Sequence, residues 1–390
     1  MKPASKAYTP LYFLASLGCG GLSVSFFMYL MFMVEHQGVP LATFDFIYPQ
    51  LTGGSLPMQS MIALALAGII VFAFLHFRLL VWNIAQYRIF RKSAEAEAMR
   101  SSHKAVSFMA VPLTYSMSVN VSFVLGAVFV PKLWTIVETL LPFAMLAFLL
   151  IGIYALKIFL GYFTDFIIQG SYDYAQNNNL SQLLGIFAFA MVSVGLAAPA
   201  AMSHVKLTSG LGFLFSTFFF VVAIGLAFIK IVLGMSSIFQ NGIDKESSAS
   251  LWIGIPIITL MGISAVRLMH GLDHNFDTSS TNTSYLILTG AFLSLQLMFG
   301  LVGYIAMKRL NYFDEYVRGT VISPGSLALI CPGVALFVFS QFFIHHGLVN
   351  NGILNQFSVI YFLLQLPLVY LQYVTIKTMF RLNHKLFLKS

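Results

Sequence analysis

The sequence predicts an all-α polytopic membrane protein, and three observations support this prediction. Of the 390 residues, 58% are hydrophobic and only 9% are charged, whereas about a quarter of the residues in soluble domains are charged. The apolar runs are about 20–28 residues long, which suits helices crossing a core of ~30 Å and exceeds barrel strands of ~10 residues. Basic residues mostly flank these runs. We therefore expect a single transmembrane domain over residues 1–390.

Ten segments have the length and composition of membrane-spanning helices. Their approximate bounds are 11–34, 57–83, 105–130, 133–160, 180–203, 207–235, 249–271, 284–307, 323–346 and 357–380. Only Pro131 and Lys132 separate the third segment from the fourth, and a few residues around Lys206 separate the fifth from the sixth. Such short connections predict antiparallel neighbours, so we expect ten helices arranged as five helical hairpins.

Two longer connections have sequences that predict local structure. Residues 83–104 contain the run SAEAEAMR, which is rich in good helix formers and predicts a short interfacial helix. Residues 161–179 hold aromatic residues, two aspartates and a run of asparagines. We expect this second segment to be an inside loop with an interfacial piece.

The distribution of lysine and arginine predicts the orientation. With the N-terminus inside, the inside segments hold Lys2, Lys6, Arg88, Arg91, Lys92, Arg100, Lys104, Lys245, Lys308, Arg309, Arg318, Lys377, Arg381, Lys385 and Lys389. The outside loops hold only Lys132 and Lys206. Because basic residues accumulate on the cytoplasmic side, we expect both termini in the cytoplasm, with the protein in a bacterial inner membrane. These flanking residues also explain the net charge of +8, so we expect no nucleic-acid partner.

The odd-numbered segments carry most of the small, polar and proline residues. The first and third hold Gly18, Gly20, Gly21, Ser23, Ser25, Thr114, Ser116, Ser118, Asn120 and Ser122. Pro112, Pro256 and Pro332 each lie about two turns into an odd segment, where a proline kinks a helix. This alternation predicts that the odd helices line a central pore and the even helices form an outer ring. The alternative is that small residues only permit close helix packing.

The glycine-rich first segment (YFLASLGCGGLSVSFFMYL), the ten spans and the prolines in odd segments resemble the tellurite-resistance/C4-dicarboxylate transporter family. That family includes the bacterial TehA proteins and the plant guard-cell slow anion channels. The resemblance implies a central pore lined by odd helices, anion permeation and a homotrimer. The stretch ALICPGVALF and the paired histidines that follow it are also similar to a small branch called TsoY. Some TsoY members are selenoproteins, which implies a redox role at Cys331.

The resemblance also directs attention to the ninth segment. In that family a phenylalanine beside the proline of the ninth helix plugs the pore, whereas here the residue before Pro332 is Cys331. Phe337 and Phe339 follow one to two turns later, and we expect one of them to constrict the path instead.

Cys19 and Cys331 are the only two cysteines in the chain. Each lies about two turns into an odd segment, so in a ring of five inner helices the two thiols would lie on neighbouring helices. Facing thiols can form a redox pair or bind a soft metal. The alternative is that both are small buried apolar residues.

Six of the nine histidines lie at the outer ends of odd segments. They are His36, His204, His270, His274, His345 and His346, accompanied by Glu35, Asp273 and Asp277. His270 and His274 are four residues apart, a helical spacing that suits shared metal ligation. We therefore consider metal or haem binding at His270, His274, His345 and His346, an anion-attracting or pH-sensing vestibule, and a purely structural role.

Arg267 is an unusual charge, because it lies inside the seventh segment and far from the cytoplasmic end. A cation within a membrane is costly unless it faces the bundle interior or a partner. In a pore it would attract anions. The alternatives are a salt bridge to Glu138 or extension of the side chain toward the outer surface.

Together these features predict a channel or secondary transporter that conducts small anions of the chloride, nitrate, sulfite or dicarboxylate class. Hydroxyls of the first and third segments, helix ends at the prolines and Arg267 would supply the polarity of the path. The alternative is a membrane redox or metal-binding protein that uses Cys19 and Cys331 or the outer histidines. No catalytic arrangement stands out, so we expect no enzyme and no resident cofactor.

Overall fold

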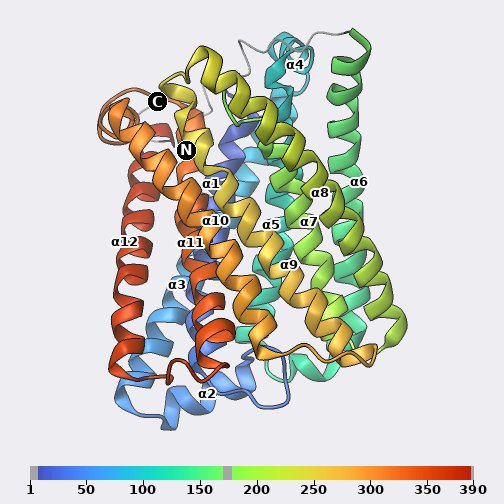
Figure 1. The fold of residues 1–390 in the computed structure, drawn as a ribbon, viewed down its shortest axis with the longest axis vertical. Helices are drawn as coiled ribbons and strands as arrows, with labels where there is room; N and C mark the ends of the chain where they lie inside the picture. The colour runs from blue at the N-terminus through green and yellow to red at the C-terminus, as the bar shows by residue number, and fades with distance from the viewer. Residues whose placement is uncertain (1–7, 170–177, 388–390) are drawn as a thin grey trace.

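The computed structural model describes residues 8–169 and 178–387, and these residues form helices and connecting turns without any strand (Figure 1). Ten helical stretches among them are long and apolar enough to cross a membrane. Their α-helices are α1 (Phe13–Met33), α3 (Leu56–Phe90), α5 (Ala110–Phe129), α6 (Val137–Gln169), α7 (Leu183–Met202), α8 (Lys206–Asn241), α9 (Gly254–Asn275), α10 (Asn282–Arg309), α11 (Ile330–Phe342) and α12 (Val359–Phe387). The prediction of an all-α membrane protein with ten spans is confirmed.

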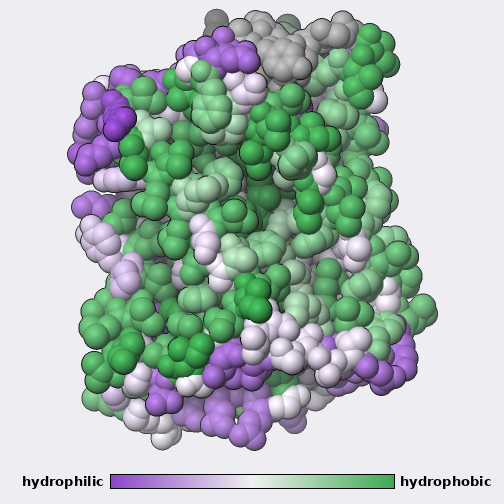
Figure 2. Space-filling model, in the orientation of Figure 1, coloured by the Kyte–Doolittle hydropathy of each residue, from purple (hydrophilic) through white to green (hydrophobic). Residues whose placement is uncertain are grey.

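The surface has the polarity of a membrane protein. Figure 2 shows apolar residues over the middle of the visible face and hydrophilic residues gathered toward the two ends. Large apolar side chains such as Leu64, Phe143, Phe228 and Leu301 are exposed on α3, α6, α8 and α10. Exposed apolar surface on this scale is stable only against lipid or another apolar surface.

Burial alternates along the chain. In α1, α5, α7, α9 and α11, with their short leading or trailing turns, 61–94% of the most apolar window is buried, against 17–39% in the other five spans. The five buried helices contact one another in a closed cycle, from α1 to α5, α7, α9, α11 and back to α1. We call these five helices the inner ring. The outer helices α3, α6, α8, α10 and α12 pack against it from outside.

Four inner helices begin with a 3₁₀ turn. The turns Pro10–Tyr12, His103–Met109, Glu246–Trp252 and Pro324–Leu329 lead into α1, α5, α9 and α11. Pro112, Pro256 and Pro332 each occupy the third residue of the α-helix that follows. A proline there removes no bond of an established helix, because the first-turn N–H groups lack partners anyway. The three prolines therefore mark where the inner α-helices begin, and not kinks within them.

The connections agree with the sequence-based prediction at one place and differ from it at others. Helix α4 (Ala94–Arg100) forms where SAEAEAMR predicts a helix, and the Ser93 hydroxyl accepts from the N–H of Ala96. Helix α2 (Phe44–Gly53) was not predicted, because Pro49 interrupts a short mixed sequence. Residues 161–169 continue α6 and are not a loop, while the rest of that predicted segment up to 177 lies outside the described residues. The helix α11 continues as a π-helix over Phe343–Val349.

The two described ends of the chain lie at the same end of the bundle (Figure 1). The rings of Tyr12 and Phe387 are 5.5 Å apart and meet nearly perpendicularly. The Nζ of Lys385 donates to the carbonyls of Tyr316 and Val321, which ties α12 to the segment between α10 and α11. The chain thus enters and leaves the membrane domain on one side.

Small residues allow the inner helices to approach closely. A Cβ on Gly18 would lie 2.6 Å from a methyl group of Ile330, so α1 and α11 meet with almost no gap. A Cβ on Gly271 of α9 would lie 2.5 Å from the backbone oxygen of Ala200 in α7. Because backbone atoms cannot rotate away as a side chain does, the contact between α7 and α9 depends on Gly271.

Gly271→Val should therefore destabilise the protein, since the new side chain forces α9 away from α7. We expect a loss of about 1–3 kcal/mol, typical of overpacking, measured as a lower midpoint of thermal unfolding in detergent. Gly225→Val is the matched control, because a Cβ at Gly225 of α8 has no heavy atom within 4 Å. Equal midpoints for the two variants would contradict this account of the contact.

Candidate functional site

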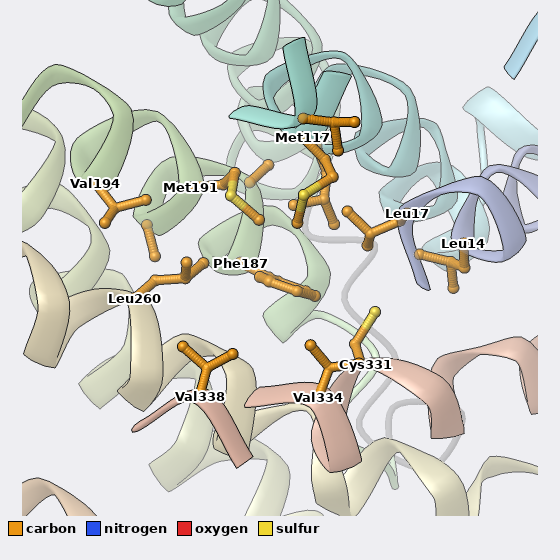
Figure 3. Close-up of a cluster of buried hydrophobic side chains, with 14 of the residues drawn as sticks. Leu14, Leu17, Met117, Phe187, Met191, Val194, Leu260, Cys331, Val334 and Val338 are labelled. Atoms are coloured by element: carbon orange, nitrogen blue, oxygen red, sulfur yellow. The ribbon is translucent and has the colours of Figure 1, made fainter. Parts of the chain in front are cut away.

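A cavity of about 170 Å³ lies inside the inner ring. All five inner helices line it, represented by Leu17 of α1, Asn120 of α5, Met191 of α7, Leu260 of α9 and Val338 of α11. No residue of the five outer helices does so. Figure 3 shows several of these side chains pointing toward one another from different helices. The cavity is thus formed jointly by all five helices of the inner ring.

Helical periodicity selects the residues that face the cavity. On α11 these include Cys331, Val334, Val338 and Phe342, which follow the three-to-four residue spacing of one helix face. On α7 they include Phe187, Met191 and Val194 at the same spacing. Phe337 and Phe339 fall between the cavity-facing positions of α11. Both side chains are fully buried, with Phe337 against Tyr29 and Phe339 against Phe292, and neither lines the cavity.

The lining is mainly apolar, and among the described residues that form it Arg267 is the only charged one. The Nη1 of Arg267 donates to the carbonyl of Val194 on α7 at 2.8 Å. Among the described residues no carboxylate lies within salt-bridge distance of the guanidinium. The alternative partner Glu138 instead accepts from the Ser203 hydroxyl and the His204 backbone N–H, at 2.7 and 2.6 Å. The cavity therefore contains a cation without a protein counter-ion.

Two further polar side chains reach the cavity wall. Asn120 donates from Nδ2 to the sulfur of Met191 at 3.5 Å, and its amide oxygen accepts no hydrogen bond from the described residues. Thr259 donates to the carbonyl of Ala335 at 3.0 Å and accepts from Nε2 of Gln296 at 2.6 Å. Thr259 is therefore committed to helix packing, whereas Asn120 and Arg267 retain hydrogen-bonding capacity toward the cavity.

Most hydroxyls predicted to line a path bond instead to neighbouring backbone. Ser23 of α1 donates to the carbonyl of Ile69, and Thr114 of α5 donates to the carbonyls of Phe13 and Ala110. Ser118 contacts Nε2 of His76 at 2.9 Å. None of these hydroxyls lines the cavity. The reason is that in an apolar bundle a hydroxyl gains most by bonding a nearby carbonyl.

A second cavity, of about 610 Å³, lies at the end of the ring where the inner helices begin. Its wall includes a residue from each of the five segments that lead into them: Thr9, Lys104, Asn179, Glu246 and Pro324. We call this cavity the vestibule. It lies on the same side as the chain ends, because α1 starts there (Figure 1).

Phe187, Pro256 and Cys331 line both cavities, so these three residues lie where the vestibule meets the central cavity. In Figure 3 the ring of Phe187 occupies the middle of the view, between Met117 and the side chains of Val334 and Cys331. Sequence reasoning missed Phe187, because the cavity face of α7 carries only apolar residues and no polar marker. The only available signal is its spacing from Met191 and Val194. Pro112 and Pro332 line neither cavity.

The two cysteines are free thiols with different surroundings. Cys331 lines both cavities. Cys19 is fully buried and lines neither, and its sulfur lies 4.0 Å from Nδ2 of Asn383 on α12. The helices α1 and α11 are neighbours, as expected, yet the cavity is open to one thiol only.

The histidines at the ends of α7, α9 and α11 opposite the vestibule pair in a pattern that their sequence spacing does not predict. The ring centres of His204 and His274 are 4.5 Å apart, and those of His270 and His346 are 5.5 Å apart. Both ring nitrogens of His345 are occupied, by the Gln341 carbonyl at 2.8 Å and the Tyr361 hydroxyl at 3.0 Å. Within residues 8–169 and 178–387, no cluster of three or more His, Cys, Asp or Glu side chains is able to hold a metal ion.

The different surroundings of the thiols predict different reactivity toward a small polar reagent. We compare two variants that each keep one thiol: Cys19→Ala keeps Cys331, and Cys331→Ala keeps Cys19. Cys331 should react with a small methanethiosulfonate at least about tenfold faster than Cys19, because access to the thiol limits the rate of modification. Labelling followed by intact-mass spectrometry gives the two rates. Equal rates would mean that Cys331 does not face an accessible cavity.

Comparison with other proteins assigns no family to the chain. Neither the models of protein families nor the curated proteins contain a match to the sequence. The resemblance to the tellurite-resistance/C4-dicarboxylate transporters therefore stays a prediction.

Proposed function

We propose that this protein is a membrane channel or secondary transporter for small anions, with a path through the inner ring. The observation that carries the proposal is Arg267, a cation on the wall of the central cavity with no carboxylate in reach. The closed cycle of inner helices and the vestibule at one end support the same function. The proposal includes the orientation expected from the basic residues, with the vestibule facing the cytoplasm of a bacterium.

The energetics favour an anion over other solutes. A cation removed from water into an apolar environment loses several kcal/mol of solvation, and one hydrogen bond to Val194 offsets only part of this. A guanidinium has five N–H donors, so donors remain for an anion in the cavity. At an effective dielectric constant near 20, opposite charges ~4 Å apart attract by about 4 kcal/mol. An anion beside Arg267 would thus replace the missing counter-ion, whereas a cation would be repelled.

Phe187 is the proposed closure of this path. Its ring lies at the junction of the two cavities, next to Cys331. In the resembling family a phenylalanine of the ninth helix plugs the pore; here that position is Cys331, and an aromatic ring from α7 is found beside it. An apolar ring at a narrow junction opposes passage of a hydrated ion until it moves aside. The homotrimer stays a proposal that rests on the resemblance alone.

Arg267→Gln tests the charge. We expect efflux of chloride or nitrate from proteoliposomes to fall at least about tenfold, since losing only 1.4 kcal/mol of attraction gives that factor. Arg267→Lys should retain part of the flux because it keeps the charge. Arg318→Gln is the control, because Arg318 pairs with Asp314 at the exposed end of the bundle. Unchanged flux and selectivity in Arg267→Gln would refute the proposed role.

Phe187→Ala tests the closure. Removing the ring should raise anion flux roughly tenfold by joining the vestibule to the central cavity. Phe189→Ala is a matched control from the same helix, because Phe189 packs against Phe159 and Phe219 and lines neither cavity. A rise in both variants, or in neither, would show that Phe187 does not close the path.

A further inference from the structure

An exposed pair of imidazoles lies at the end of the bundle opposite the vestibule. His204 belongs to the turn between α7 and α8, and His274 to the last turn of α9. The two ring centres are 4.5 Å apart and the ring planes are inclined by 64°. Both residues are exposed, so the pair is open to solvent.

Hydrogen bonds hold the backbone on both sides of this pair. The carboxylate of Glu138 accepts from the backbone N–H of His204 at 2.6 Å and from the Ser203 hydroxyl at 2.7 Å. Asn275, the neighbour of His274, donates from Nδ2 to the carbonyl of Ser203 at 3.0 Å. These bonds fix the backbone that carries the two rings, which lowers the part of the entropic cost of ligand binding that comes from ordering the backbone.

The separation of the rings matches that of two imidazoles on one metal ion. With metal–nitrogen bonds of ~2.0–2.1 Å and bond angles between a square and a tetrahedral one, the two ring centres lie roughly 4.5–5.2 Å apart. The observed 4.5 Å falls at the short end of this range. The carboxylate of Glu138, which accepts from the backbone N–H of His204, adds a negative charge near the site. Lys206, two residues further along the chain, adds a positive one.

We propose that His204 and His274 form a binding site for a divalent transition-metal ion such as Zn²⁺ or Ni²⁺, completed by water. Imidazole nitrogen favours these ions over Mg²⁺ and Ca²⁺, which prefer oxygen. Two protein ligands leave the remaining coordination positions to solvent, because no third His, Cys, Asp or Glu among the described residues completes a cluster. The bound ion would join the outer end of α9 to the turn between α7 and α8. The site exists whether or not an anion passes through the ring.

Other histidines of the described chain fit this role less well. The rings of His270 and His346 are 5.5 Å apart, and His346 also contacts the rings of Phe32 and Phe342. His345 has both nitrogens engaged. His270 lies one turn before His274 on α9, yet its ring contacts Tyr285 and His346, whereas His274 contacts His204.

Isothermal titration of ZnCl₂ and NiCl₂ into the detergent-solubilised protein, with any histidine tag removed, tests the proposal. The native protein should bind about one ion per chain. His204→Gln and His274→Gln should each weaken binding by at least about tenfold, as expected for losing a ligand. His270→Gln and His36→Gln should leave the affinity unchanged, and circular dichroism with thermal unfolding confirms that all four variants are folded.

Glu138→Gln gives a second readout. Glu138 holds the backbone of His204 in position and is not itself a proposed metal ligand. We expect metal affinity to fall about tenfold, with Glu138→Asp recovering part of it. Absence of binding by the native protein would overturn the proposal. So would binding that His204→Gln leaves intact, or binding that depends on His270, since an ion would then sit along α9 and not between the two elements.

Discussion

The position of Arg267 within the apolar inner ring is the constraint on which the central cavity depends. A guanidinium in an apolar ring of helices has to be held away from lipid and given hydrogen-bond partners. The carbonyl of Val194 supplies one partner from α7 and thereby connects two inner helices at the cavity wall. The guanidinium makes no other hydrogen bond to the described residues, and it lines a cavity with little other polarity. This incomplete solvation distinguishes the cavity from an ordinary packing defect, which would be lined by apolar groups alone.

The helix α7 has a central place in this arrangement. It is the most buried of the ten spans, and it contacts α5, α6, α8 and α9. It supplies the carbonyl that bonds Arg267, the ring of Phe187 and, through Ala200, the surface against which Gly271 packs. Its polar side chain Ser193 donates to the carbonyl of Ser216 on α8, so the contribution of α7 to the cavity consists of backbone and apolar volume.

Much of the fold was predictable because the lipid bilayer requires long apolar helices, which are visible in the sequence. Ten apolar runs give ten spans, and the small residues of the odd runs correspond to the buried helices. The site was less predictable. Arg267 was visible as a lone charge in an apolar run, but Phe187 was not, because its role comes from the rotation of α7 relative to its neighbours. Hydroxyls such as Ser23 and Thr114 suggested a polar path, yet each bonds a backbone carbonyl. The pairing of His204 with His274 depends on the turn after α7, which spacing along one helix cannot give.

The most direct measurement is a crystal structure with bromide, whose anomalous scattering locates the ion independently of the refined model. An unpaired Arg267 predicts a bromide peak in the central cavity, at hydrogen-bonding distance of the guanidinium, and its loss in Arg267→Gln. Bromide found only on the outer surface, with the guanidinium held by further protein groups, would contradict the account. In that case the inner ring would be a packed core with a small cavity and not a path for anions.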